Sequence, residues 1–539
     1  MEWAAERRRW RVRLGDDRGR IHGAGLMLDD RHLLTCAHVV ESCGGRDARV
    51  AVDFVGVAGT PSGWAGVVAD GWVPPTDDGG GDIALLRLEE PATGVGGARL
   101  HRMSLRDDQP VRAYGFPDGA DDGAWTLGEL AGEGGPGGEW VQLDNTSGVR
   151  VGPGFSGTAL LDRETGAVVG MIVSRYTGED GRVAWMIPVE TMLGHLPRLR
   201  EWSTGEPAVD DSFIQPGDAS DDAADVAFTQ KVVTWLNRTG SGSVWAVVTG
   251  DDESAITKAL RVTVVHADRE RSVSAPQFPR GAGDPPPPGA VDLAVDARGR
   301  SAGEVGDRIK ERLKLDDLGS ARDCTVVIDG VDSAAEPLPL VDEVVTALAG
   351  RAARRGVRLL LAFRRESSPS WKAVRSLVEA GLGERLDALS KDIDQLAAFE
   401  EVQFILAKRY TGVAGASRRA TRLRSGFNQF RGAQADGDLD WVERNLADFE
   451  RRVSRAVEAG RGWRADLDGR DARLTELRAL LACYAEMSAA RGLIEDPRLE
   501  QLYRPAEEAL FKPPFSLAAA DQAVQAYVAA VRDRLEDRP

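Results

Sequence analysis

Short apolar runs separated by Gly, Asp and Pro turns fill the N-terminal part of the chain. Examples are "HLLTCAHVV", "GDIALLRL" and "VVGMIVSRY", each bounded by polar or turn-forming residues. Many short strands at regular spacing are typical of an all-β barrel or sandwich. We therefore expect residues 1–202 to form an all-β domain.

The hydrophobic pattern weakens after this region. Residues 203–227, "STGEPAVDDSFIQPGDASDDAADVA", are acidic, contain Gly, Pro and Ser, and have few large apolar side chains. A segment of this composition has little apolar surface to bury and tends to remain extended. We expect an acidic linker here.

Continuous apolar runs replace the short ones from residue 228 onward. They are "VWAVVTG", "VDLAVDA", "CTVVIDG" and "VRLLLAF". Unbroken runs of Val, Leu and Ile are typical of strands buried on both faces of a parallel sheet. The pair Ser301 and Glu304 forms a capping-box motif that predicts the start of an intervening helix. We expect an α/β domain over residues 228–385.

The last part of the chain has almost no strand signal. Ala, Leu, Arg and Glu dominate it, and apolar residues recur at helical spacing near the end. The residues on this face are Val524, Tyr527, Val528, Val531 and Leu535. The pattern predicts a helical bundle over residues 386–539.

The length and net charge of the chain exclude some classes of protein. A chain of 539 residues is too long for one core, which agrees with several domains. The net charge of −17 argues against nucleic acid as the main partner. No apolar run approaches the roughly 18 residues of a membrane span, and the N-terminus lacks the apolar core of a signal peptide. We expect a cytoplasmic protein without membrane contact.

The cysteines fit a reducing compartment. Cys36, Cys43, Cys324 and Cys483 are too few and too scattered for a disulfide framework. No Cys/His cluster has the spacing of zinc ligands along the sequence. We expect neither a structural metal nor a cofactor.

Three residues of the β domain have the functional groups that acyl transfer by serine requires. His38 follows an apolar strand in "LLTCAHVV", Asp82 precedes one in "GGGDIALLRL", and Ser156 lies in "GPGFSGTALL". They could serve as base, orienting acid and nucleophile. Each taken alone is more typical of a structural role, as a core histidine, a strand-start aspartate or a turn serine.

Glycines around Ser156 add a fourth functional group. Gly154 leaves room for a turn in which the backbone amides of Gly154 and Ser156 point the same way. Such a pair of donors can form an oxyanion hole.

The order His, Asp, Ser on a predicted all-β chain resembles a trypsin-like serine protease of the bacterial HtrA-like branch. The resemblance covers about residues 15–200 and rests on "TCAHVV", "DIALLRL", "GPGFSGTAL" and "AWMIPVETM". It implies a double six-stranded β-barrel with the triad in the cleft between barrels. It also implies that His38 is the general base, Asp82 the orienting carboxylate and Ser156 the nucleophile.

The chain departs from the family pattern around the nucleophile. Phe155 stands where secreted trypsins carry the Asp that pairs with a freed N-terminus, and no cleavable start sequence exists. Activation by zymogen cleavage is therefore not expected. Thr158 replaces a common second glycine, and Cys36 and Cys43 do not sit where the family disulfide would need them.

Two further residues concern substrate binding. By the family alignment, Arg150 falls at the floor of the pocket for the residue before the scissile bond, and Ser174 at its wall. A buried arginine there would favour an acidic substrate residue. The alternative is a solvent-facing loop arginine.

The α/β domain has a damaged phosphate-binding motif. In "TGDDESAITKAL", Gly250 and Thr257 match the first Gly and the hydroxyl position of a P-loop, but Ala255 and Ile256 occupy the positions of the second Gly and the Lys. "CTVVIDGVDSA", with Asp329 and Asp332, resembles a Walker-B strand. The region resembles a degenerate STAND-like NTPase module, and we expect no NTP hydrolysis.

These features predict a regulated serine endopeptidase acting on a protein or peptide. Its STAND-like and helical modules would sense an activating protein partner, as in effector–sensor proteins of bacterial conflict and immunity systems. The alternative is a catalytically silent scaffold, a pseudoprotease joined to a pseudo-NTPase.

Overall fold

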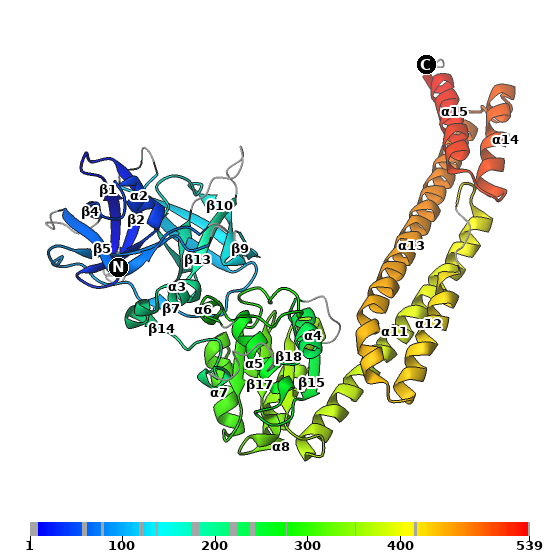
Figure 1. Cartoon of the computed structure of the whole chain (residues 1–539). Helices are drawn as coiled ribbons and strands as arrows, with labels where there is room; N and C mark the ends of the chain where they lie inside the picture. The colour runs from blue at the N-terminus through cyan, green and yellow to red at the C-terminus, as the bar shows by residue number, and fades with distance from the viewer. Residues whose placement is uncertain are drawn as a thin grey trace. The chain divides into compact units, whose positions relative to one another are not determined.

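The computed structural model forms two compact units, residues 1–377 and 378–539 (Figure 1). It describes residues 9–55, 62–76, 80–117, 120, 122–135, 138–173, 183–215, 224–237, 243–275, 277–350, 352–413 and 418–536. Within these residues, none of the helices combines the length and apolarity needed to cross a lipid bilayer.

The first barrel is a closed antiparallel sheet of six strands. Their order is β1-β2-β3-β6-β5-β4. The strands are β1 (Arg11–Gly15), β2 (Ile21–Met27), β3 (His32–Thr35), β4 (Val50–Phe54), β5 (Gly63–Val73) and β6 (Ile83–Leu88). Inward side chains such as Val12, Leu34 and Leu86 are fully buried. A short helix, α2 (Ala37–Ser42), follows β3 directly and leads off the barrel.

The second barrel closes through pairing of its first and last members. The order β11-β8-β9-β10-β13-β12 is completed by the pair β11–β12. The strands are β8 (Pro110–Gly115), β9 (Ala124–Gly134), β10 (Trp140–Gly148), β11 (Ala159–Asp162), β12 (Val168–Val173) and β13 (Val183–Pro188). Two short strands, β7 (Leu100–His101) and β14 (Ser203–Thr204), extend the sheet beyond β12. The expected double six-stranded barrel is confirmed.

Part of the segment expected to be a linker is packed. After α3 (Val189–His195), β14 pairs with β7, and Val209 forms a parallel bridge with Ala294. Ala208, Val209 and Phe213 are buried. Asp210 forms ion pairs with Arg300 and Arg308. A few apolar side chains and a paired aspartate thus order residues 203–213 despite their acidic composition, whereas residues 216–223 lie outside the described part.

The α/β domain is a sheet of four parallel strands in the order β15-β18-β17-β16. They are β15 (Val244–Val248), β16 (Leu293–Asp296), β17 (Thr325–Asp329) and β18 (Arg358–Phe363). The connecting helices include α4 (Val226–Leu236), α5 (Ala255–Ala267), α6 (Arg269–Ser272) and α7 (Ala302–Leu313). The Ser301–Glu304 capping box is formed at the start of α7. The expected parallel sheet is confirmed.

Buried ion pairs join the second barrel to the α/β domain within the first unit. Arg312 of α7 pairs with Glu190 of α3 at 2.7 Å, and their side chains are only 2% and 6% exposed. Glu270 of α6 pairs with Arg102 and Arg200, both at 2.8 Å. A buried charge needs a partner of opposite charge, because an unpaired buried charge lowers the stability of the fold by roughly several kcal/mol. The two domains are therefore joined by specific polar contacts as well as by the chain.

The second unit is helical, as expected. It comprises the remainder of α11 (Pro369–Arg409), followed by α12 (Arg419–Ala435), α13 (Leu439–Ala490), α14 (Pro497–Phe511) and α15 (Leu517–Glu536). The predicted apolar face of α15 is confirmed for Val524, Tyr527, Val528 and Val531, which are buried, while Leu535 is partly buried. The expected boundary at residue 385 falls inside α11, whose continuous helical backbone runs across it.

Candidate active site

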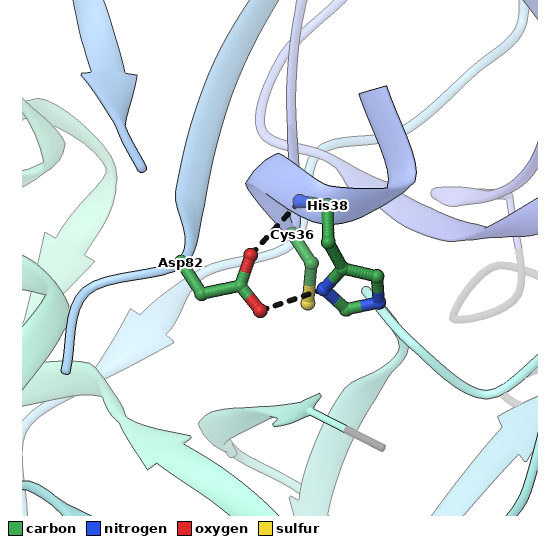
Figure 2. A group of neighbouring side chains, drawn as sticks. All are labelled: Cys36, His38 and Asp82. Carbon is green, nitrogen blue, oxygen red and sulfur yellow. Dashed lines mark hydrogen bonds and ion pairs between the residues drawn. The ribbon is translucent and has the colours of Figure 1, made fainter. Parts of the chain in front are cut away.

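His38 and Asp82 are held together by two hydrogen bonds from one histidine to one carboxylate. His38 lies in the first turn of α2, and its backbone N–H donates to Asp82 Oδ1 at 2.9 Å. Its ring Nδ1 lies 2.6 Å from Asp82 Oδ2. The carboxylate thus satisfies one of the free N–H groups at the helix start and also orients the ring. The other ring nitrogen, Nε2, points away from Asp82 (Figure 2).

Asp82, which lies directly before β6, has an unusual backbone conformation. Its φ is +67°, in the left-handed region that few non-glycine residues adopt. Its side chain is only 1% exposed. Strained conformations of this kind persist where the surrounding structure determines them, and they cluster at functional sites.

Burial distinguishes this pair from the other histidine–carboxylate pairs of the barrels. His22, His32 and His195 also lie within 3.0 Å of a carboxylate, and those carboxylates are 17%, 34% and 19% exposed. Asp82 is 1% exposed and His38 is 33% exposed. A buried carboxylate behind a partly accessible imidazole is the arrangement that a general base requires.

The segment that carries Ser156 packs directly against the segment that carries His38. The Gly157 N–H donates to Ile172 O at 2.9 Å, and Cys36 Sγ donates to the same oxygen at 3.4 Å. A Cβ added to Gly23 would lie 2.7 Å from Val39 Cγ2 and 2.9 Å from Ser156 O. The structure therefore brings the backbone of Ser156 close to α2. Ser156 itself is 4% exposed.

The turn before Ser156 depends on glycine. Gly154 has φ +90°, and an added Cβ would lie 2.1 Å from Phe116 O. Its carbonyl accepts a hydrogen bond from the Phe116 N–H at 2.9 Å. Its own N–H donates no hydrogen bond to any described residue, and Gly154 is half-buried. A fixed, unused backbone N–H beside a serine is what an oxyanion hole needs.

Phe155 anchors the same turn in the core of the second barrel. Its side chain is fully buried among residues such as Val111, Leu143 and Ile172. A Cβ on Gly115 would lie 2.4 Å from the Phe155 ring, so the glycine makes space for it. A buried hydrophobic side chain thus fixes the backbone directly before Ser156.

Cys36 is a neighbour of this pair that the sequence did not single out. It precedes α2, is fully buried, and its Sγ lies within 4.8 Å of the facing atoms of His38 and Asp82 (Figure 2). Burial, together with the nearby Asp82 charge, raises the pKa of this thiol well above its usual value. The raised pKa favours the neutral form of the thiol. A short C-x-H spacing was the only sequence signal for this contact.

The two predicted substrate-binding residues have different outcomes. Arg150, two residues after the end of β10, is exposed, which agrees with the solvent-facing alternative. Ser174 lies outside the described residues.

Charged groups pair with one another at the carboxyl edge of the parallel sheet. Arg364, just after β18, contacts Asp329 through two hydrogen bonds of 2.7 Å and donates to Thr249 Oγ1 at 2.9 Å. Lys258 of α5 pairs with Glu253 at 2.8 Å. The predicted loop starts at Gly250, whose φ is +84°. Lys258 and Arg364 are therefore already paired with carboxylates.

Comparison with known protein families identifies a peptidase domain in the N-terminal part of the chain. Residues 23–171 match the family model of the trypsin-like peptidase domain. No curated protein matches the chain. Among solved structures, the inactive form of the Rv3671c protease of M. tuberculosis H37Rv is 19% identical, with 36% of this chain and 91% of that chain covered and a TM-score of 0.28. The HtrA-type protease AlgW with a decapeptide is 19% identical, with coverages of 39% and 72% and a TM-score of 0.29. The chain thus carries a trypsin-like peptidase domain.

Proposed function

We propose that the chain is a serine endopeptidase that uses His38, Asp82 and Ser156 to cleave protein or peptide substrates. The observation that carries the proposal is the 2.6 Å contact between His38 Nδ1 and the buried Asp82 carboxylate. The adjoining segment presents a serine and a glycine turn, and the domain matches a peptidase family model.

We infer the following reaction for these residues. Nε2 of His38 accepts the Ser156 hydroxyl proton while the oxygen attacks the scissile carbonyl carbon. Asp82 keeps the remaining ring proton on Nδ1 and stabilises the imidazolium. The Gly154 and Ser156 N–H groups bind the developing oxyanion. His38 then gives its proton to the leaving amine, and water hydrolyses the acyl-enzyme by the same steps in reverse.

We propose that the other domains regulate this activity and that the site is not made by zymogen cleavage. Phe155 holds the nucleophile turn by burial in the barrel core, so no freed N-terminus is needed. The buried Glu190–Arg312 pair offers a mechanical link from the α/β domain to the second barrel. The α/β domain, in this proposal, acts as a degenerate STAND-like module that senses a protein partner in a cytoplasmic conflict or immunity system.

We also propose that this module hydrolyses no nucleotide. Phosphate binding at a P-loop uses a lysine for the β- and γ-phosphates. Here Ile256 takes that position, Lys258 pairs with Glu253, and Arg364 pairs with Asp329. A bound phosphate would have to compete with these internal carboxylates.

Arg150 fits a limited role in this scheme. Its exposed position would let it attract an acidic substrate residue only at the surface of the protein, not in a buried pocket. Any such preference should therefore be weak and salt-sensitive.

The proposed function is tested by labelling with a fluorescent fluorophosphonate. The full chain, its Ser156→Ala variant and the fragment 1–377 are compared at equal concentration. Fragment 1–377 is chosen because it keeps the ion pairs between barrel and α/β domain. Ser156-dependent labelling of the full chain or the fragment supports the protease, and stronger labelling of the fragment indicates restraint by the helical unit. Absence of labelling in both favours the silent scaffold.

A separate prediction concerns the oxyanion turn. Gly154→Ala is expected to slow fluorophosphonate labelling by about 100- to 1,000-fold, the effect of losing one oxyanion donor. The added Cβ would collide with Phe116 O and force the turn to move. Gly152→Ala is the matched control, because a Cβ there meets nothing within 4 Å. Equal labelling rates in the two variants would contradict the assignment of Gly154.

A further inference from the structure

Three side chains of different chemistry converge on one point behind the catalytic imidazole. Cys36 Sγ and one atom each of His38 and Asp82 all lie within 4.8 Å of one another (Figure 2). Among the described residues, no other group of three His, Cys, Asp or Glu side chains meets this condition. We propose that Cys36, His38 and Asp82 form an inhibitory zinc site that competes with catalysis for His38; its effect on activity rests on the proposed function.

The donor set suits zinc better than the hard cations. A thiolate, an imidazole nitrogen and a carboxylate oxygen are the ligand types of Zn²⁺, whereas Mg²⁺ and Ca²⁺ prefer oxygen alone. Sites with three protein ligands leave a fourth position for water. The mixed Cys, His and Asp set therefore indicates an exchangeable zinc rather than a closed structural one.

The required movements are small. Tetrahedral zinc with ligand distances of about 2.0–2.3 Å places its donor atoms roughly 3.3–3.6 Å apart. His38 Nδ1 and Asp82 Oδ2, now 2.6 Å apart, would separate by less than the length of a covalent bond. Cys36 Sγ would give up its 3.4 Å hydrogen bond to Ile172 O. That carbonyl keeps the Gly157 N–H as a partner.

Burial explains how an ion would enter. Cys36 and Asp82 are 0% and 1% exposed, whereas the side chain of His38 is 33% exposed. The ion therefore reaches the two buried ligands past the accessible edge of the imidazole. The same burial keeps water away from the bound Zn²⁺ and so strengthens its attraction to the Asp82 carboxylate.

Zinc at this position is incompatible with general-base catalysis. Coordination by Nδ1 moves the ring proton to Nε2, and the Cys36 thiol proton is released to solvent while the thiolate stays on the metal. Nε2–H then faces the serine and cannot accept its proton. Asp82 no longer orients the ring. Removal of zinc returns one proton to the thiol and restores the Nδ1–H tautomer.

Zinc binding is tested on Ser156→Ala protein, so that the result is independent of activity. The exposed Cys483 is replaced by serine in all samples to remove a surface thiol. We expect Co²⁺ to give a thiolate charge-transfer absorption band and Zn²⁺ to bind one-to-one by calorimetry. Cys36→Ala should abolish the band and weaken zinc by more than the roughly 10- to 100-fold that loss of an outer-shell partner costs.

The control for buried thiols is Cys43→Ala, since Cys43 is also buried and caps the other end of α2. It should keep the cobalt band. Circular dichroism confirms that each variant is folded, and His38→Ala provides a second ligand deletion. Absence of a band in Ser156→Ala protein, or a band that persists in Cys36→Ala, overturns the zinc site.

The effect on activity is measured separately with Ser156 intact. Zn²⁺ should slow fluorophosphonate labelling of the parent protein, so that the ratio of the rates with and without Zn²⁺ is below one. A chelator should restore the rate. In Cys36→Ala the ratio should stay near one. If zinc lowers labelling equally in Cys36→Ala, the metal binds without the thiol and the three-ligand site is wrong. If no protein is labelled at all, the proposed protease fails while the cobalt result still decides the metal site.

Discussion

Replacement of Ser156 by alanine is expected to lower kcat/KM for peptide cleavage by about 10⁶-fold, the order of loss seen when a catalytic serine or histidine is removed. The change deletes one oxygen and leaves the backbone contacts of the turn in place, including the hydrogen bond from the Ala24 N–H to the residue 156 carbonyl at 2.8 Å. Thermal unfolding should therefore be nearly unchanged. The measurement is hydrolysis of a fluorogenic peptide selected from a library by the parent protein.

The His38→Ala variant and the Ser156→Ala, His38→Ala double variant provide the control for this prediction. Residues that act as one unit give non-additive losses, so the double variant should lose no more than either single variant. A much larger loss in the double variant would mean that His38 and Ser156 act separately, and the triad would then be the wrong description of the site.

The barrels were predictable because their strands have a strong local signature. Runs such as "GDIALLRL" alternate with glycine-rich turns. Such a run favours a strand whether the sheet buries one of its faces or both. The order His38, Asp82, Ser156 along the chain indicated which family of β-barrel proteins the domain resembles, the trypsin-like peptidases. The contact between His38 and Asp82 spans 44 residues, so only the family resemblance, not local pattern, could indicate it.

Other features needed the structure because they depend on contacts between distant segments. The segment 203–213 has the composition of a linker, yet Val209 and Phe213 find an apolar surface on the α/β domain. The left-handed backbone of Asp82 has no sequence signature beyond the glycines before it. Cys36 approaches Asp82 only because β3 and β6 are neighbours in the barrel.

The same reasoning explains why the substrate remains the least predictable part of the site. Arg150 was placed at the pocket floor by counting back from Ser156, a procedure that assumes equal loop lengths. The structure leaves it exposed. Loops vary more in length and conformation than the elements they connect, so counting along the sequence is a weaker guide to the substrate pocket than to residues beside barrel strands.

Asp82→Asn is expected to lower kcat/KM by about 10⁴-fold while the fold is kept. Asp82 accepts two hydrogen bonds from His38, one from the backbone N–H at 2.9 Å and one from Nδ1 at 2.6 Å. An asparagine has only one acceptor oxygen. If that oxygen takes the backbone N–H, its NH₂ group faces Nδ1 and forces the proton onto Nε2, where it blocks the transfer from Ser156.

A second histidine–aspartate pair in the same barrel supplies the matched control. His32 Nδ1 lies 2.9 Å from Asp29 Oδ2, and Asp29 also accepts the His32 backbone N–H at 2.7 Å through Oδ1. Asp29→Asn imposes the same change of hydrogen bonding on a pair that we assign no catalytic role. It should cost some stability and leave kcat/KM within a few-fold of the parent. If Asp29→Asn and Asp82→Asn reduce activity equally, both act through general destabilisation. A loss confined to Asp82→Asn, with equal melting temperatures, ties the activity to the tautomer of His38.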